Sequence, residues 1–274
     1  MARWIWLEDT RGLDITTVCG CPNDCYYCPQ DAFKAAYHGK PRLSLEDFNT
    51  VISALPKDLL ISFSGFSEPF LNSDCMNMIE STVSHGLKVS INTTFIGMHE
   101  DDVRRLSKLP ISYFCAHLPD NKGNAKIQVT EEYKDVLVLA LQSLRIDSFS
   151  VMNDNFASVD NERAGLLKHA PRRNVRGMFN CGLLEYPHLV LLPNCDVALC
   201  CQDFGLRHVL GNLLTSSYDE ILSSPAFRSI RANRHRMSGD ILCRRCAVAT
   251  PILEYNLFKA STRTLNFLRK KFQS

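Results

Sequence analysis

LDITTVCGCPNDCYYCPQ, residues 13–30, decides which fold the sequence predicts. A β-rich run, Leu13 to Val18, leads directly into a loop whose three cysteines have the spacing CxxxCxxC, at Cys21, Cys25 and Cys28. Three thiolates from one loop can hold three irons of a [4Fe-4S] cluster, whose usual complement is four Cys ligands. The fourth iron then keeps an open coordination position, which indicates catalysis, whereas a structural zinc loop normally uses four ligands in CxxC pairs.

The cysteine loop resembles the cluster loop of the radical S-adenosylmethionine (SAM) superfamily. In that family the open iron chelates the amino and carboxylate groups of SAM, and one electron from the cluster splits SAM into methionine and a 5'-deoxyadenosyl radical. The radical removes hydrogen from unactivated C–H bonds, which protein side chains alone cannot do. The same resemblance implies that Tyr27, the aromatic residue before the last cysteine, lies near the adenine.

Short β-rich runs alternate with amphipathic helical stretches from Gly12 to Asn153, which indicates an α/β fold with a parallel sheet built from βαβ units. We expect strands at residues 13–18, 59–64, 87–92, 111–117 and 148–153, and helix caps at Ser44, Ser73 and Thr130. The family resemblance implies that these elements form a partial (β/α)6 barrel of the radical SAM type. Working residues of parallel barrels lie where strands end, and the cysteine loop follows the first strand.

The loop after the second predicted strand, SGFSEPF at residues 64–70, resembles the GGxEP motif that grips the SAM amino group. The resemblance implies that the SAM-binding residues here are Gly65, Ser67, Glu68 and Pro69, with Phe66 where the second glycine usually stands. Glycine lets a backbone approach a ligand, and a carboxylate accepts strong hydrogen bonds from an ammonium group. Taken alone, the segment would be an ordinary strand-to-helix turn.

Polar residues near the ends of other strands are further candidates. Asn92 and Asn153 could bond the ribose or carboxylate of SAM, or simply cap their strands. Arg163 lies in NERAG, which is similar to an SRAGN-like signature of the family, and could pair with a carboxylate or lie on the surface. Cys115 and His117 share one face of the fourth strand. They are the catalytic candidates, as hydrogen-atom donor and proton acceptor, unless they are a buried thiol and a strand-end histidine.

Six further cysteines gather between residues 181 and 246. Their spacing, with a late CxxC, resembles the twitch domain, an abbreviated SPASM domain, and implies one auxiliary [4Fe-4S] cluster held by Cys181, Cys200, Cys243 and Cys246. Zinc on the same four thiolates is the competing interpretation. Cys195, where the pattern has glycine, and Cys201 are alternative ligands. We expect a first domain over residues 1–172 and a second, smaller one over 173–274.

Composition excludes several classes of protein. The chain has 274 residues, 45% of them hydrophobic and 22% charged, and its net charge of +2 gives no reason to expect a nucleic acid partner. No apolar run approaches the ~20 residues that span a bilayer, and the first residues lack a signal-peptide pattern, so we expect a cytoplasmic protein without a membrane partner. Twelve cysteines then indicate metal clusters rather than disulfides. An arginine-rich helical stretch, 225–235, is expected to be a solvated face or to attract an anionic substrate.

The expected function is that of a radical SAM oxidoreductase in a biosynthetic pathway, with a SAM-binding cluster, SAM and an auxiliary cluster as cofactors. We expect dehydrogenation or epimerisation of a small molecule such as a sugar, an aminocyclitol or a nucleotide-like compound, with electrons from a flavodoxin- or ferredoxin-like donor. Only about a dozen residues precede the first strand, where peptide-modifying relatives often carry a recognition domain. Peptide modification and a non-catalytic zinc or iron-sulfur module stay as alternatives, and the oligomeric state is left open.

Overall fold

The structure, a computed structural model, describes residues 10–152, 162–167 and 174–257. Within these ranges an eight-stranded sheet forms the centre of the molecule, in the order β5-β4-β3-β2-β1-β7-β8-β9. Its strands are β1 (Gly12–Ile15), β2 (Leu60–Phe63), β3 (Lys88–Thr93), β4 (Tyr113–Pro119), β5 (Ser148–Met152), β7 (His188–Leu191), β8 (Asp196–Ala198) and β9 (Val209–Asn212). Neighbours from β5 to β7 pair in parallel, whereas β7, β8 and β9 pair antiparallel. A separate pair joins β6 (Phe179–Asn180) to β10 (Thr250–Pro251).

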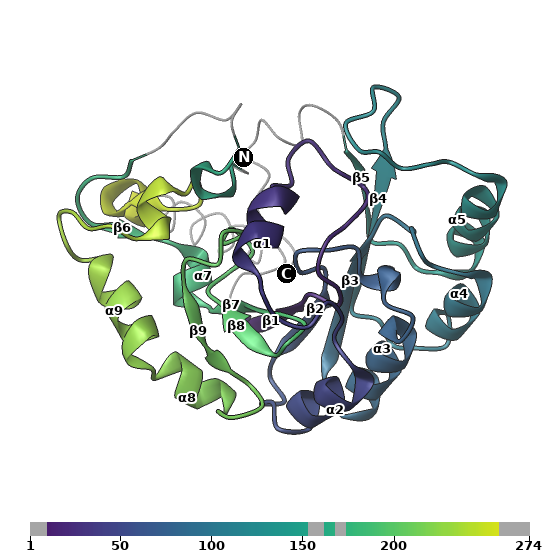
Figure 1. Cartoon of the computed structure of the whole chain (residues 1–274), viewed down its shortest axis with the longest axis horizontal. Helices are drawn as coiled ribbons and strands as arrows, with labels where there is room; N and C mark the ends of the chain where they lie inside the picture. The colour runs from purple at the N-terminus through teal and green to yellow at the C-terminus, as the bar shows by residue number, and fades with distance from the viewer. Residues whose placement is uncertain (1–9, 153–161, 168–173, 258–274) are drawn as a thin grey trace, which may run out of the picture.

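Helices cover the outer side of this sheet. Each of four helices connects two parallel strands: α2 (Leu45–Ser53), α3 (Cys75–Ser84), α4 (Glu100–Leu106) and α5 (Glu131–Ser143). Figure 1 shows the strands as an open arc with these helices along its outer side, and α8 (Tyr218–Leu222) and α9 (Pro225–Asn233) beyond β9. The fold is the predicted α/β class, and the sheet stays open rather than closing into a barrel among the described residues. None of the helices that the structure describes combines the length and apolarity needed to cross a membrane.

The two faces of the sheet differ in chemistry because successive strand residues point to opposite sides. Leu13 and Ile15 of β1 are buried in the large apolar core that the outer helices cover. The residue between them points the other way, and the strand register places Asp14 beside Ser62 and Ser62 beside Ser90. Parallel sheets usually bury apolar residues on both faces. Here the inner face is polar, which suits a polar ligand.

Strand β1 ends three residues before the predicted end, at Ile15 rather than Val18. Beyond Ile15 the chain leaves the sheet, because Val18 forms an antiparallel bridge with Arg42 and the Cys19 amide donates to Pro41 O (2.7 Å). The cysteine loop therefore starts from this short antiparallel contact rather than from the parallel sheet itself.

Two of the three predicted helix caps are confirmed. Ser44 caps α2 and Thr130 caps α5, each by accepting a hydrogen bond from the amide three residues further on. The prediction for Ser73 is wrong, because Asp74 is the residue that precedes α3. The Asn72 side chain accepts from the Asp74 amide (3.0 Å), so an asparagine turn replaces the serine cap.

The C-terminal half of the chain extends the same sheet, because β7 pairs in parallel with β1. The Tyr218 hydroxyl of α8 lies 3.3 Å from Gly12 O and fastens that helix to β1. Strands β7 and β8 form a hairpin, with Cys195 at φ +65° in the turn. The parallel pairing of β7 with β1 makes the C-terminal half a continuation of the same sheet. The division into residues 1–172 and 173–274 stays a prediction.

Candidate functional site

The first candidate site is the loop between β1 and α1 (Gln30–Ala36), which carries Cys21, Cys25 and Cys28. All three cysteines are half-buried, and the Cys28 amide donates to Cys25 O (2.8 Å) in a tight turn. Burial first, and the two neighbouring thiols next, raise the pKa of Cys25 to about 12. Burial likewise raises the pKa of Cys21 to about 11. The three thiols are therefore close neighbours, and binding of a metal cluster would release their protons.

Neighbouring segments hold this loop in place. The Asn23 side chain donates to Thr94 Oγ1 (2.9 Å) just beyond β3, and the Lys126 amide donates to Asn23 O (2.6 Å). On the side of α1, the Gln30 side-chain nitrogen lies 3.2 Å from Cys28 Sγ. The cysteine loop thus lies at the carboxyl ends of the parallel strands, which is where parallel α/β folds bind their ligands.

Glu68 is a buried carboxylate beside the cysteine loop. It precedes η2 (Pro69–Leu71) and accepts hydrogen bonds from Thr93 Oγ1, Thr94 N and Thr94 Oγ1, each at 2.7 Å. Burial raises the pKa of Glu68, and these donors counteract that rise only in part. After burial, the Glu68 charge contributes to the raised pKa of Cys21, so the carboxylate faces that thiol. Its partners in the described residues are neutral donors, and a cationic group of a ligand would be its natural counter-ion.

The rest of the motif at residues 64–70 surrounds this carboxylate. Gly65 has φ +34°, and a Cβ there would lie 2.5 Å from Thr16 Oγ1, so only glycine allows this close approach to the chain after β1. Pro69 begins η2. Ser67 is buried, and its hydroxyl has no hydrogen-bond partner among the described residues. Buried hydroxyl groups are nearly always hydrogen-bonded, so this one is available to a ligand.

Tyr27 and Arg163 connect the cysteine loop to the C-terminal half. Tyr27 is buried against Met152. Arg163, the first residue of η3 (Arg163–Gly165), donates from Nε to Tyr27 O (3.4 Å) and from Nη1 to Cys201 O (3.0 Å). Its guanidinium lies 5.0 Å from the centroid of the Phe204 ring. Arg163 therefore bridges the two cysteine groups through backbone carbonyls instead of lying on the surface.

The remaining predicted residues lie along the inner face of β3 and β4. The register places Asn92 beside Cys115, and His117 follows Cys115 on the same face. Burial raises the pKa of Cys115, and burial lowers the pKa of His117 to about 4, which leaves the imidazole neutral near pH 7. Asn153 lies outside the described residues. The roles suggested for these four residues stay predictions.

Sequence analysis missed a polar pair on the same inner face. His188 Nδ1 lies 3.3 Å from Asp14 Oδ1, and the two side chains are only 4% and 10% exposed. The imidazole lies over Gly12, where a Cβ would come within 2.0 Å of Nε2. His188 Nε2 is buried without a hydrogen-bond partner in the described part of the chain. If Nδ1–H is donated to Asp14, the neutral imidazole presents Nε2 as a bare acceptor. The sequence signal for this pair was a carboxylate inside an apolar strand run.

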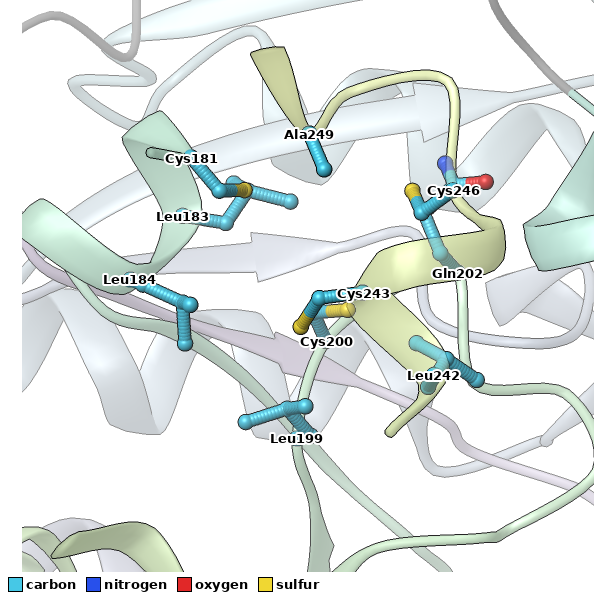
Figure 2. A pocket seen from close by; sticks show the side chains of 10 residues that line it. All are labelled: Cys181, Leu183, Leu184, Leu199, Cys200, Gln202, Leu242, Cys243, Cys246 and Ala249. Carbon is cyan, nitrogen blue, oxygen red and sulfur yellow. The ribbon is translucent and has the colours of Figure 1, made fainter. Parts of the chain in front are cut away.

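The second candidate site is a pocket in the C-terminal half that four cysteines help to line (Figure 2). Cys181 precedes α7 (Gly182–Glu185), Cys200 follows β8, and η4 (Leu242–Arg245) carries Cys243 and is followed by Cys246. The other lining residues are Leu183, Leu184, Leu199, Gln202, Leu242 and Ala249. Figure 2 shows the four cysteine side chains approaching this largely apolar pocket from three segments of the chain.

The chemistry of this pocket fits a metal cluster. Burial raises the pKa of Cys181 to about 11 and that of Cys246 to about 12, and it raises the pKa of Cys200 and Cys243 as well. Four thiols are the full ligand set of a closed [4Fe-4S] cluster, in which each thiolate binds a different iron. Among the described residues, no three His, Cys, Asp or Glu side chains are arranged to hold a single metal ion.

The two alternative ligands differ in position: the Cys201 thiol is close enough to Cys200 and Cys181 to raise their pKa further, so its role as a ligand stays a prediction. Neither Cys195 nor Cys201 lines the pocket. Cys195 is in the turn between β7 and β8, where its amide donates to Leu192 O (2.8 Å). The carbonyl of Cys201 accepts from Arg163, and after burial the nearby Asp14 carboxylate is the largest cause of the raised pKa of its thiol. Cys201 thus lies between the polar pair and the cysteine loop.

The second candidate site lies in a region that matches a known protein family. Residues 181–247 match the SPASM family, described as an iron-sulfur cluster-binding domain. This range includes all four cysteines that line the pocket. No curated protein sequence matches the chain.

Solved structures share the fold over most of the chain. The crystal structure of BtrN in complex with AdoMet (SAM) and 2-DOIA is 16% identical, with 89% of this chain and 94% of BtrN covered and a TM-score of 0.61. Native anSMEcpe with bound AdoMet is 12% identical, with 85% and 90% covered and a TM-score of 0.54. Streptococcus suis SuiB bound to the precursor peptide SuiA is 15% identical, with 87% and 70% covered and a TM-score of 0.52. These matches establish the fold.

Proposed function

We propose that this chain, which has the fold of the radical SAM enzymes and carries a SPASM iron-sulfur cluster-binding region, cleaves SAM reductively in order to oxidise a small polyhydroxylated substrate. The observation that carries the proposal is the position of the CxxxCxxC loop. It lies at the carboxyl ends of the parallel strands, beside the buried Glu68 carboxylate and at the edge of the polar inner face.

The residues around the loop fit a cluster with bound SAM. The three thiolates of the loop would hold three irons and leave the fourth for the amino acid part of SAM. Glu68 would accept hydrogen bonds from the SAM amino group, the buried Ser67 hydroxyl would bond a SAM oxygen, and Tyr27 would lie near the adenine. When bound and reduced, this cofactor pair supplies a 5'-deoxyadenosyl radical that removes a hydrogen atom from a C–H bond.

Oxidation of an alcohol to a ketone removes one hydrogen atom, one proton and one electron. On the polar inner face, the Asp14 carboxylate with His188 Nδ1 3.3 Å away is the pair that would take the proton. His117 is poorly suited to this role, since burial lowers its pKa to about 4, far from the working pH. Cys181, Cys200, Cys243 and Cys246 would hold the group that accepts the electron.

A small polar substrate is favoured over a peptide. The inner face of the sheet combines Asp14 and His188 with serine hydroxyls, of which Ser90 donates to Ser62 (2.8 Å). The match to BtrN, whose structure contains 2-DOIA, has the higher TM-score, 0.61 against 0.52 for SuiB with its precursor peptide. Peptide modification is the second candidate, because SuiB and anSMEcpe have also been solved with bound peptides.

Anaerobic reconstitution tests the proposed chemistry. We expect about eight irons per chain, and equal amounts of methionine and 5'-deoxyadenosine after reduction with dithionite. Cys25→Ala should lower the iron content to about four per chain and abolish SAM cleavage. Cys243→Ala is the matched control, since it should lose a similar amount of iron and still cleave SAM. Intact SAM after reduction of fully loaded protein would refute the proposal, and about four irons with one zinc would remove the second cluster.

A deuterium-transfer assay tests the substrate class. The active protein is offered deuterated aminocyclitols, hexoses and nucleotide sugars, and separately deuterated peptides, and the 5'-deoxyadenosine is analysed by mass spectrometry. Deuterium from a polyol supports the leading proposal. Deuterium from a peptide alone would replace it by the second candidate.

A further inference from the structure

Helix α9 presents a row of arginines to solvent. Arg228 and Arg231 are exposed and three residues apart, so they share one side of the helix, and Arg236 is exposed just beyond its end. The opposite side is buried through Phe227 and Ile230, which anchor the helix to the core. We refer to four residues together as the α9 basic face: Arg228, Arg231, Arg234 and Arg236.

No carboxylate of the described residues compensates this face. The side-chain hydrogen bonds of Arg234 go to Asn180 Oδ1 (3.3 Å) and to the neighbouring histidine, and none of the four arginines forms an ion pair in the described part of the chain. In the preceding helix α8, Asp219 pairs with Arg11, and Glu220 caps the helix. Like charges three or four residues apart on a helix repel each other. An anionic partner would remove that repulsion.

The surroundings of the face are also positive. Arg207 and Arg245 share one carboxylate, that of Asp240. Together with the four arginines of the α9 basic face, this group contributes six arginines and one carboxylate, a formal charge of +5. Met237, which is 73% exposed, adds an apolar contact point directly after Arg236.

A buried arginine fastens the α9 basic face to the cysteine pocket. Arg244 lies in η4 next to Cys243, and its guanidinium donates to Asn233 O (3.1 Å) and Arg236 O (2.7 Å) at the end of α9. Figure 1 shows α9 directly beside the yellow segment to which η4 belongs. The end of the basic face is thus held against the part of the chain that lines the pocket with two of its four cysteines.

We infer that the α9 basic face docks an acidic one-electron carrier protein, so that the carrier exchanges electrons at the pocket lined by Cys243 and Cys246. The inference rests on the proposed function, because it needs a redox group in that pocket. The electron that substrate oxidation would leave in the pocket would pass to the oxidised carrier, which would then depart in its reduced form. Complementary charge speeds and orients such short-lived encounters. A small anionic substrate would need a concave, enclosing site, whereas these arginines lie on an exposed helix, so a protein partner is favoured.

Binding of purified oxidised flavodoxin to the reconstituted protein tests the inference. The face variant carries Arg228→Glu and Arg231→Glu. The matched control carries Arg104→Glu and Lys134→Glu, the same change of formal charge on α4 and α5, on the side of the molecule away from α9 (Figure 1). By isothermal titration calorimetry, we expect the face variant to bind at least tenfold more weakly than the wild type and the control to bind normally. Raising the salt from 50 to about 200 mM should weaken wild-type binding, because exposed charges are screened.

Other outcomes overturn the inference. Equal affinity of the wild type and the face variant would do so, as would the absence of any wild-type binding, or binding of a nucleotide sugar at this face in place of flavodoxin. Arg228→Lys with Arg231→Lys should retain binding, since the charge remains. Dithionite-driven SAM cleavage needs no docking and should be equal in all variants. Failure of that reaction would count against the proposed function and leave the docking result to be judged separately.

Discussion

Replacement of Arg244 by methionine measures how far the C-terminal half depends on one buried cation. Arg244 is 3% exposed, and its guanidinium donates to four carbonyl oxygens, those of Val175 (2.9 Å), Gly177 (3.0 Å), Asn233 (3.1 Å) and Arg236 (2.7 Å). It also lies 5.1 Å from the centroid of the Phe179 ring. Methionine keeps the apolar length of the side chain and removes every donor.

The expected loss in the free energy of unfolding depends on which of these carbonyl oxygens are buried away from solvent. The bonds to Val175 O and Asn233 O are buried, as is a longer bond from Nε to Asn233 Oδ1 (3.3 Å), whereas those to Gly177 O and Arg236 O are partly exposed and can be replaced by water. A hydrogen bond from a charged group contributes roughly 1.5–3 kcal/mol. The two buried bonds to carbonyl oxygens therefore contribute about 4 kcal/mol, the long bond adds little, and relief from burying a cation without a carboxylate partner lowers the net loss to about 3 kcal/mol.

Urea unfolding under anaerobic conditions, followed by circular dichroism, measures this loss. Arg228→Met is the matched control, because Arg228 is exposed and its replacement should change the free energy of unfolding by less than about 0.5 kcal/mol. Arg244→Lys should lie between the two, since an ammonium group cannot reach all the carbonyls that a guanidinium fork reaches. If Arg244→Met unfolds at the same urea concentration as the wild type, the four carbonyls do not depend on this side chain and the reasoning fails.

Three further changes test the active-site assignments. Glu68→Gln should weaken SAM binding at least tenfold at unchanged iron content, because an amide carries no negative charge to pair with an ammonium group. Equilibrium dialysis with labelled SAM measures the affinity, and an unchanged affinity would contradict the assignment. Asp14→Asn should lower substrate oxidation about 100-fold or more, the range for loss of a general base, and leave substrate-free SAM cleavage intact, with His188→Gln as its matched partner. Burial lowers the pKa of His117 from 6.5 to about 4. Between these pH values the unfolded chain binds a proton at this residue and the folded chain does not. The free energy of unfolding therefore falls as the pH drops from about 6.5 to about 4. His117→Asn should remove that part of the acid sensitivity, as judged from urea midpoints at pH 7 and pH 5, and equal shifts in both proteins would speak against a buried neutral imidazole.

Local sequence patterns were enough to predict most of the N-terminal architecture. The cysteine spacing, the β-rich runs and the caps at Ser44 and Thr130 depend on residues close together in the chain, and each is present in the structure. The failure at Ser73 has a local cause too, since Asn72 offers a competing turn that propensity alone does not rank. The observed ends of the strands differ from the predicted ends by up to three residues.

The polar pair at the inner face depends on contacts that the linear sequence does not contain. Asp14 and His188 meet only because β7 takes the place beside β1. The residues next to Asp14 and His188 in the sequence do not predict that the two strands pair. A different pattern was visible: polar residues stand at alternate strand positions, as Ser62 and Ser90 do, whereas a fully buried parallel strand is apolar throughout. That alternation was the available signal for a polar inner face.

The position of Arg163 was also beyond local reasoning. The family signature suggested a carboxylate partner or the surface, but the side chain spans from Tyr27 O to Cys201 O. Such a bridge exists only once the N-terminal loop and the segment after β8 have folded against each other. The partners of Arg163 could not be predicted because they lie far from it in the sequence.

The shared edge between β1 and β7 has a practical consequence for anyone who wishes to shorten this protein. Deleting the chain after residue 174 would remove β7 and make β1 an edge strand with unpaired amide and carbonyl groups. Such an exposed edge pairs with strands of other molecules and promotes aggregation. A trimmed version would thus be lost to aggregation before its chemistry could be assayed. The half that carries the cysteine pocket is part of the frame on which the half with the cysteine loop is built, and the two must be engineered as one piece.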